Sequence, residues 1–169
     1  MLTTRGHPMM EWSDEVYSVG LPEIDEQHKT LFNLVNTIHA AIYEHKGTAA
    51  CIGVLEELAD YTRVHFALEE KLMQQGHYPA FEQHRELHHA LVNEVVALLE
   101  QIHAGQAKIS FQLLHFLRGW LKNHILVEDK KYGEFFATYG TGENYEDWAR
   151  NSYEAIEKRG KKKKWWKFW

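Results

Sequence analysis

Apolar residues recur along this chain at spacings of three and four, and they do so in four separate tracts. The tracts cover about residues 24–42, 55–72, 81–102 and 114–128. Such spacing places the apolar side chains on one side of a helix, as expected for helices that face a common core. Short connections between long helices favour antiparallel neighbours. The sequence therefore predicts an all-α, antiparallel up-down-up-down four-helix bundle.

Glycine and proline residues separate the four predicted helices. Residues 20–22 (Gly-Leu-Pro) precede the first helix, and Gly47 follows it. Residues 76–79 close the second helix, and Gly105 stops the third. Gly133 lies beyond the fourth helix and is expected to end it. These residues are typical of helix ends, because proline fits the first helical position and glycine tolerates the backbone that follows the last.

Polar residues occupy positions in these tracts that should face the core. Five of the 12 histidines and one glutamate do so: His28, His65, Glu69, His84, His88 and His124. Burying such groups without partners costs free energy, and a bound metal ion compensates for that cost. Chance alone accounts for one pair of histidines four residues apart, so the argument depends on all four helices contributing. Imidazole and carboxylate also suit zinc, and the residue types leave the metal open.

Five short motifs surround these candidate ligands. They are Trp12-Ser13-Asp14, IDEQHK at 24–29, HFALEE at 65–70, Tyr78-Pro79 with His84 and His88, and HILVED at 124–129. Together they resemble the bacterial hemerythrin (bacteriohemerythrin) family over about residues 12–135. The resemblance implies a non-haem di-iron centre with a bridging oxide or hydroxide, and dioxygen as its ligand.

The resemblance also implies a role for each of seven ligands. These are His84, His88 and His124 on one iron, His28 and His65 on the other, and Glu69 and Asp129 as bridges between them. If each iron takes about six ligands, these residues and a bridging oxide, with each bridge counted on both irons, fill about eleven of about twelve positions and leave one open. That position lies on the iron with two histidines, where the family binds dioxygen.

Asp129 is the ligand that regular helix geometry supports least. Five steps of about 100° place it roughly 140° around the helix from His124, so local unwinding or a bent approach is required. Glu128 lies four residues after His124 and fits a regular helix better. It remains the structural alternative to Asp129.

Apolar residues beside the ligands are expected to form the dioxygen pocket, namely Leu31, Phe66, Leu121 and Ile125. The sequence offers no candidate proton donor beside them. Without an acid to promote cleavage of the oxygen–oxygen bond, reversible binding is favoured over oxygenation. We therefore expect a non-enzymatic protein for dioxygen binding, storage or delivery. The alternatives are an oxygen sensor and a di-iron oxidase or an enzyme that handles peroxide or nitric oxide.

The chain divides into four predicted parts. They are an N-terminal arm (1–20), the di-iron bundle (21–135), a docking helix (136–158) and a basic-aromatic tail (159–169). A rough helical stripe is expected to dock this helix against the bundle or a partner: Tyr145, Trp148, Ala149, Ser152, Tyr153 and Ile156. About 35 residues follow the bundle, too few for the output domain of a sensor.

Charge is unevenly distributed, because the last eleven residues hold six of the 19 basic residues and no acidic one. The net charge of −5 thus becomes −11 without them, from 13 basic and 24 acidic residues. An acidic body is not expected to bind nucleic acid. Lysines and aromatic residues favour an anionic membrane surface, so Lys161–Trp169 is expected to place the protein beside a membrane-bound oxygen-consuming enzyme. An acidic protein partner, nucleic-acid stacking and an engineering artefact are the competing interpretations.

The remaining expectations concern the compartment. No stretch reaches the roughly 18 apolar residues of a membrane span, and the first residues lack the apolar core of a signal peptide. The single cysteine, Cys51, excludes a framework of internal disulfides. We expect a cytoplasmic protein that associates peripherally with the inner membrane through its tail. The sequence leaves the oligomeric state open.

Overall fold

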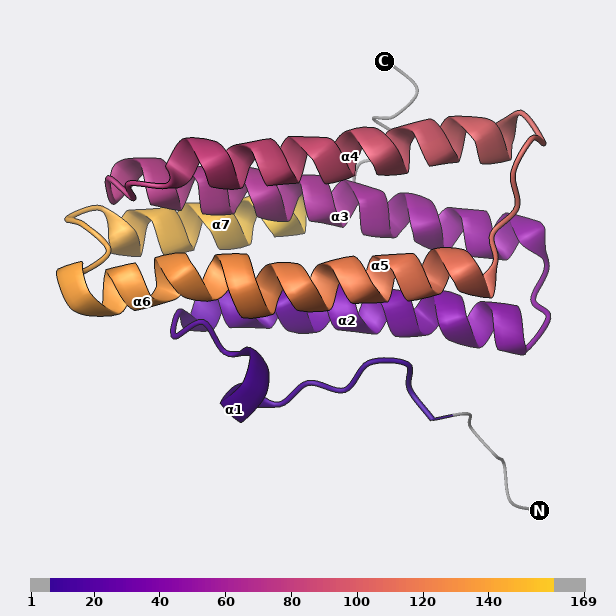
Figure 1. The fold of residues 1–169 in the computed structure, drawn as a ribbon, viewed down its shortest axis with the longest axis horizontal. Helices are drawn as coiled ribbons and strands as arrows, with labels where there is room; N and C mark the ends of the chain where they lie inside the picture. Colours follow the sequence, from indigo (N-terminus) through magenta and orange to yellow (C-terminus); the bar gives the residue numbers. More distant parts are fainter. Residues whose placement is uncertain (1–6, 160–169) are drawn as a thin grey trace.

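A computed structural model describes residues 7–159 and shows an antiparallel four-helix bundle with additions at both ends (Figure 1). The elements are α1 (Asp14–Tyr17), α2 (Pro22–Tyr43), α3 (Thr48–Gln75), α4 (Phe81–His103), α5 (Phe111–Asn123), a π-helix η1 (His124–Asp129), α6 (Lys130–Tyr139) and α7 (Tyr145–Arg159). The connections lie at alternating ends of the bundle. Residues 7–159 contain no strand. The predicted all-α, up-down-up-down architecture is therefore confirmed.

Local sequence explains where the first bundle helix begins. Pro22 occupies the first turn of α2, where its fixed φ suits a helix and its missing N–H is not needed. Asp25 is also in that turn and accepts hydrogen bonds from the Val19 amide at 2.9 Å and the Ser18 hydroxyl at 2.6 Å. This carboxylate thus joins the arm to the start of α2.

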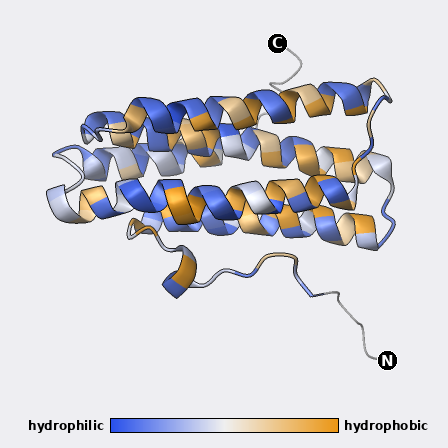
Figure 2. Cartoon of the chain, in the orientation of Figure 1, coloured by the Kyte–Doolittle hydropathy of each residue, from blue (hydrophilic) through white to orange (hydrophobic). Residues whose placement is uncertain are grey.

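The core follows the predicted apolar stripes with small shifts. Ile24, Leu31, Leu55 and Leu114 are at most 1% exposed, and apolar and polar residues alternate around each long helix (Figure 2). Near the end of α4, Leu99 is buried whereas its neighbour Leu98 is half-buried. The helices therefore meet along the faces that the periodicity indicates.

The fourth helix is longer and less regular than predicted. It passes from α5 through η1 into α6 and remains helical to Tyr139, so the prediction that it ends at Gly133 is wrong. Gly133 is buried within α6, and a Cβ atom there would lie 2.2 Å from the carbonyl oxygen of Val19. Glycine is needed at this position for close approach to the arm, whereas the helix ends at Gly140, which has a φ of 80°.

The last helix packs on the bundle. Trp148 of α7 is 2% exposed and Ser152 is 1% exposed, as expected for the predicted docking stripe. Tyr153 differs from the prediction, because its side chain is 71% exposed and points away from the core. No helix among residues 7–159 is both long enough and apolar enough to cross a membrane.

Candidate metal centre

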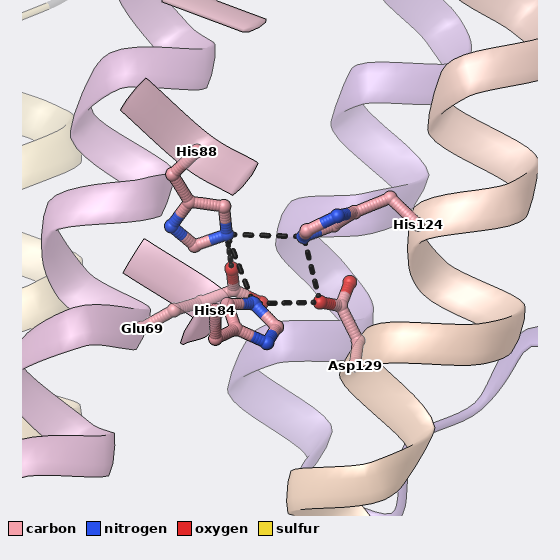
Figure 3. A group of neighbouring side chains, drawn as sticks. All are labelled: Glu69, His84, His88, His124 and Asp129. Carbon is pink, nitrogen blue, oxygen red and sulfur yellow. Dashed lines mark hydrogen bonds and ion pairs between the residues drawn. The ribbon is translucent and has the colours of Figure 1, made fainter. Parts of the chain in front are cut away.

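All seven predicted ligands converge inside the bundle. Two groups of side chains present ligand atoms within 4.8 Å of one another: Glu69, His84, His88, His124 and Asp129 in one, and His28, His65 and Glu69 in the other. Every member is at most 3% exposed. Figure 3 shows the five side chains of the first group pointing toward a common centre. They come from α3, α4 and η1. The two groups share Glu69, so they form one continuous cluster.

A π-helix places Asp129 in this cluster. Hydrogen bonds from residue i to i+5 widen the helix, so a residue five positions later returns to the same side. In η1 this brings Asp129 Oδ1 to 3.0 Å from Nε2 of His124, and Asp129 is fully buried. Glu128 instead forms an ion pair at 2.8 Å with Lys131, outside the cluster. The local unwinding that Asp129 requires is therefore present.

Both carboxylates divide their two oxygens between the histidine groups. In both Glu69 and Asp129, one oxygen faces at least one residue of the pair His28 and His65, and the other faces at least one of the three remaining histidines. In Glu69, Oε1 lies 3.6 Å from Nε2 of His28 and 3.4 Å from Nε2 of His65, while Oε2 lies 3.3 Å from Nε2 of His88. In Asp129, Oδ2 lies 3.2 Å from Nε2 of His28, while Oδ1 lies 3.3 Å from Nε2 of His84 and 3.0 Å from Nε2 of His124. Each carboxylate therefore lies between the two groups of histidines.

Hydrogen bonding inside the cluster is incomplete without a cation. Both ring nitrogens of His28, both oxygens of Asp129 and one oxygen of Glu69 are buried with no hydrogen-bond partner among residues 7–159. Nε2 of His88 lies 3.0 Å from Nε2 of His84. Ligand atoms about 3 Å apart fit neighbouring positions around one metal ion, because metal–nitrogen bonds are about 2.1 Å long. The residues present therefore fit a metal centre.

Partners outside the cluster fix the orientation of the histidines. Nδ1 of His88 lies 2.9 Å from Glu70 Oε1, and Nδ1 of His65 lies 2.8 Å from Gln27 Oε1. Because a carboxylate or amide oxygen only accepts, Nδ1 carries the hydrogen in each ring and Nε2 presents its lone pair inward. Such partners are typical of histidines that bind metal.

Three neighbouring side chains complete the walls around the ligands. The Tyr132 hydroxyl donates to Glu69 Oε1 at 2.5 Å. Phe66 stacks on His88 with ring centroids 3.7 Å apart, and Trp120 stacks on His124 at 4.4 Å. Sequence reasoning missed Tyr132, Gln27 and Glu70. The only available signal for Tyr132 was its place three residues after Asp129, on the same helix.

Electrostatics in the cluster favours a cation. Burial lowers the pKa of His28, but the neighbouring carboxylates of Asp129 and Glu69 outweigh burial and raise it to about 9. Burial raises the pKa of Asp129, but the neighbouring imidazoles, above all His124, hold it well below its usual value. Burial and the nearby Glu69 raise the pKa of Tyr132, so its hydroxyl keeps its proton. Both buried carboxylates therefore keep their negative charge, which favours a cation between them.

The four residues predicted to form the dioxygen pocket are all buried. Leu31, Phe66, Leu121 and Ile125 are at most 7% exposed. Leu31 and Leu121 line a cavity of about 40 Å³ between the helices, in which Thr62 is the only lining residue with a polar side chain apart from the indole of Trp120. Phe66 lies flat on His88 instead. Ile125 follows His124 directly and is completely inaccessible to solvent.

A bundle with five buried histidines and two shared carboxylates defines a protein with a dinuclear metal centre. Residues 19–136 match the model of the hemerythrin HHE cation binding domain. The chain is 36% identical over 126 residues to a bacteriohemerythrin of Methylococcus capsulatus, covering 74% of this chain and 95% of that protein. It is 34% identical over 132 residues to a hemerythrin-like protein of Naegleria fowleri, covering 78% and 97%.

Solved structures agree with these sequence matches. The crystal structure of a wild-type hemerythrin superimposes with a TM-score of 0.71 at 34% identity, covering 75% of this chain and 96% of that one. The chain belongs to the hemerythrin family, and its metal centre is accordingly a di-iron centre. The sequence matches and the crystal structure leave about a quarter of the chain uncovered, and the family model ends before α7 begins.

Proposed function

We propose that this protein binds dioxygen reversibly at its di-iron centre and thereby stores or delivers oxygen. The observation that carries the proposal is the division of both carboxylates between two unequal groups of histidines. We assign His84, His88 and His124 to one iron, His28 and His65 to the other, and Glu69 and Asp129 as bridges. An iron held by His28 and His65 would have fewer protein ligands than one held by His84, His88 and His124, and would offer a coordination position to an external ligand.

The residues around the centre favour binding over turnover. When bound, the two irons supply the electrons that dioxygen takes up and returns. Leu31 and Ile125 are at most 1% exposed and keep water from the ligands. Tyr132 donates its hydrogen to Glu69 and has a raised pKa, so this proton is held in place. A site without a readily transferred proton does not promote cleavage of the oxygen–oxygen bond.

Optical spectra through repeated cycles of oxygenation test this function. Protein loaded with iron and reduced is expected to contain about two irons per chain and to be nearly colourless. Oxygen should produce a visible charge-transfer band that disappears when oxygen is removed. Irreversible oxidation with conversion of an added substrate would instead identify an enzyme.

Two neighbouring substitutions test the ligand assignment. Asp129→Asn removes the charge of a buried carboxylate that faces three imidazoles, so it should lower the iron content and abolish the oxygen-dependent band. Glu128→Gln is the matched control, because Glu128 pairs with Lys131 outside the cluster. Equal losses in both variants would contradict the assignment of Asp129.

We further propose that Lys161–Trp169 binds an anionic membrane surface and so places the oxygen carrier beside a membrane-bound oxygen-consuming enzyme. The segment lies outside the described residues, and its composition supports the proposal: five lysines and four aromatic residues within nine positions. Each lysine near such a surface contributes about 1 kcal/mol, and aromatic rings favour the interface.

Vesicle flotation separates this proposal from its alternatives. The full chain should float with vesicles that contain anionic lipid, less so at high salt, and a chain that ends at Arg159 should not. Equal behaviour of the two chains would reject a membrane role for the tail.

A further inference from the structure

Helix α7 joins two bundle helices by hydrogen bonds. The Tyr145 hydroxyl donates to Glu23 in the first turn of α2. Nε1–H of Trp148 donates to the backbone carbonyl of Leu68 on α3 at 2.9 Å. The rings of Tyr145 and Trp148 stack with centroids 5.5 Å apart. Among the α7 side chains that the structure describes, Tyr145 and Trp148 make the hydrogen bonds to other helices, and these go to α2 and α3.

The contact on α3 lies at a metal ligand. The Leu68 carbonyl is part of the peptide bond that joins Leu68 to Glu69. Trp148 therefore holds the backbone directly before this proposed bridging residue. A carbonyl has two lone pairs, so it can accept from Trp148 and from its own helix together. Trp148 is 2% exposed and Leu68 is 9% exposed, which shields the bond from water. The carboxylate of Glu69 is fixed separately, by Tyr132 at 2.5 Å.

The two joined helices carry one half of the metal centre. His28 comes from α2, whereas His65 and Glu69 come from α3. The remaining histidines come from α4 and from η1, to which α7 makes no hydrogen bond within the described residues. A change in the separation of α2 and α3 would therefore displace ligands of the two-histidine position before those of the other.

We propose that α7 is a brace that sets the spacing of α2 and α3 at the His28–His65–Glu69 metal position, with Trp148 and Tyr145 as positioning residues. This inference rests on the proposed function, because that function assigns an iron with an open coordination position to these three ligands. Helix α7 begins nine residues after the family match ends, so the brace is an addition to the shared fold. Its effect is to slow the loss of metal from the position that binds the external ligand.

The rate of iron loss to a ferrous chelator tests the brace in the full-length, reduced and iron-loaded protein. Trp148→Phe keeps most of the ring and removes the N–H donor, and Tyr145→Phe removes the hydroxyl. Loss of one buried hydrogen bond corresponds to about a fivefold change. We expect one of the two irons to leave about fivefold faster in each variant, and faster still in the double variant. The other iron should accelerate less, because it shares only Glu69 with the braced helices and takes its histidines from α4 and η1. Tyr153→Phe is the matched control, because Tyr153 is 71% exposed on the same helix.

Hydrogen exchange of the metal-free protein gives a second readout. The amide of Leu72 faces the Leu68 carbonyl within α3, so its exchange should accelerate in Trp148→Phe relative to Tyr153→Phe. Equal acceleration of both irons, or identical behaviour of the Trp148 and Tyr153 variants, would overturn the brace. Selective iron loss in a protein that fails to bind oxygen reversibly would support the brace and reject the proposed function. Reversible oxygen binding with an unchanged rate of release of both irons in the variants would support the proposed function and reject the brace.

Discussion

Replacing Tyr132 with phenylalanine removes a single oxygen atom from a fully buried site beside the metal ligands. The Tyr132 hydroxyl donates to Glu69 at 2.5 Å, and neither residue is accessible to solvent. The ring remains, including its edge contacts with Tyr78 and His84 at centroid distances of 6.4 Å and 5.5 Å. The change therefore isolates one hydrogen bond to a charged group.

A hydrogen bond of this kind contributes about 1.5–3 kcal/mol to stability. For a chain of this size, 1 kcal/mol shifts the melting temperature by about 2–4 °C. We expect Tyr132→Phe to melt about 3–12 °C below the parent protein. Scanning calorimetry of the iron-loaded proteins measures the shift directly.

Tyr78 supplies a matched control for this measurement. It is 9% exposed and packs against Tyr132 and Phe135, yet its hydroxyl bonds to no protein group among residues 7–159. Tyr78→Phe should therefore change stability by less than about 0.5 kcal/mol. If the two variants melt at the same temperature, the Tyr132 hydroxyl does not support Glu69 as argued.

Three further expectations follow from particular residues. Gly133→Ala should destabilise the protein by about 1–3 kcal/mol in urea titrations, because the added carbon would lie 2.2 Å from the Val19 carbonyl oxygen. Gly119→Ala is the control and should be neutral or stabilising, because nothing lies within 4 Å of a Cβ atom there. An equal loss of stability in both variants would contradict the close approach at Gly133. Removing iron should lower the melting temperature and restoring it should reverse the change, since a ligand at a hundred times its Kd contributes about 2.7 kcal/mol; an unchanged melt would count against a buried centre. Leu121→Glu places a carboxylate beside the apolar cavity and should hasten loss of the oxygen-dependent band. Leu87→Glu is the control and should leave the band unchanged, because Leu87 is 41% exposed. If the band decays equally fast in both variants, Leu121 does not line the dioxygen pocket.

The helices could be predicted because burial imposes a regular period on the sequence. Ile24, Leu31 and Leu55 recur at spacings of a helix face, and each is at most 1% exposed. The polar residues of α3 and α4 follow the same period and are therefore buried as well. His65 and Glu69 are four residues apart, and so are His84 and His88. Ligand pairs at this spacing need no information beyond a regular helix.

The remaining details depend on contacts between distant segments. In the sequence Gly133 resembles the end of a helix, yet it lies within α6 and its φ is not positive. Glycine is needed there because a Cβ atom would lie 2.2 Å from the carbonyl oxygen of Val19. Trp148 could be placed on a docking stripe, but its bond to Leu68 depends on how α7 crosses α3. Gln27 and Tyr132 look like ordinary polar residues until the fold brings them to His65 and Glu69. No local pattern encodes such pairings.

The π-helix explains why the fourth helix differs from the others. A regular helix after His124 would direct residue 128 toward the cluster, and Asp129 would lie too far around the axis to share its oxygens between both histidine groups. The additional residue per turn in η1 brings Asp129 to 3.0 Å from His124 and 3.2 Å from His28. It also sets the register of α6, so that Tyr132 reaches Glu69 and Gly133 meets the arm. One local irregularity thus places Asp129 between the two groups of histidines, Tyr132 at Glu69, and Gly133 against the arm. These contacts compensate for the otherwise unfavourable geometry of the π-helix.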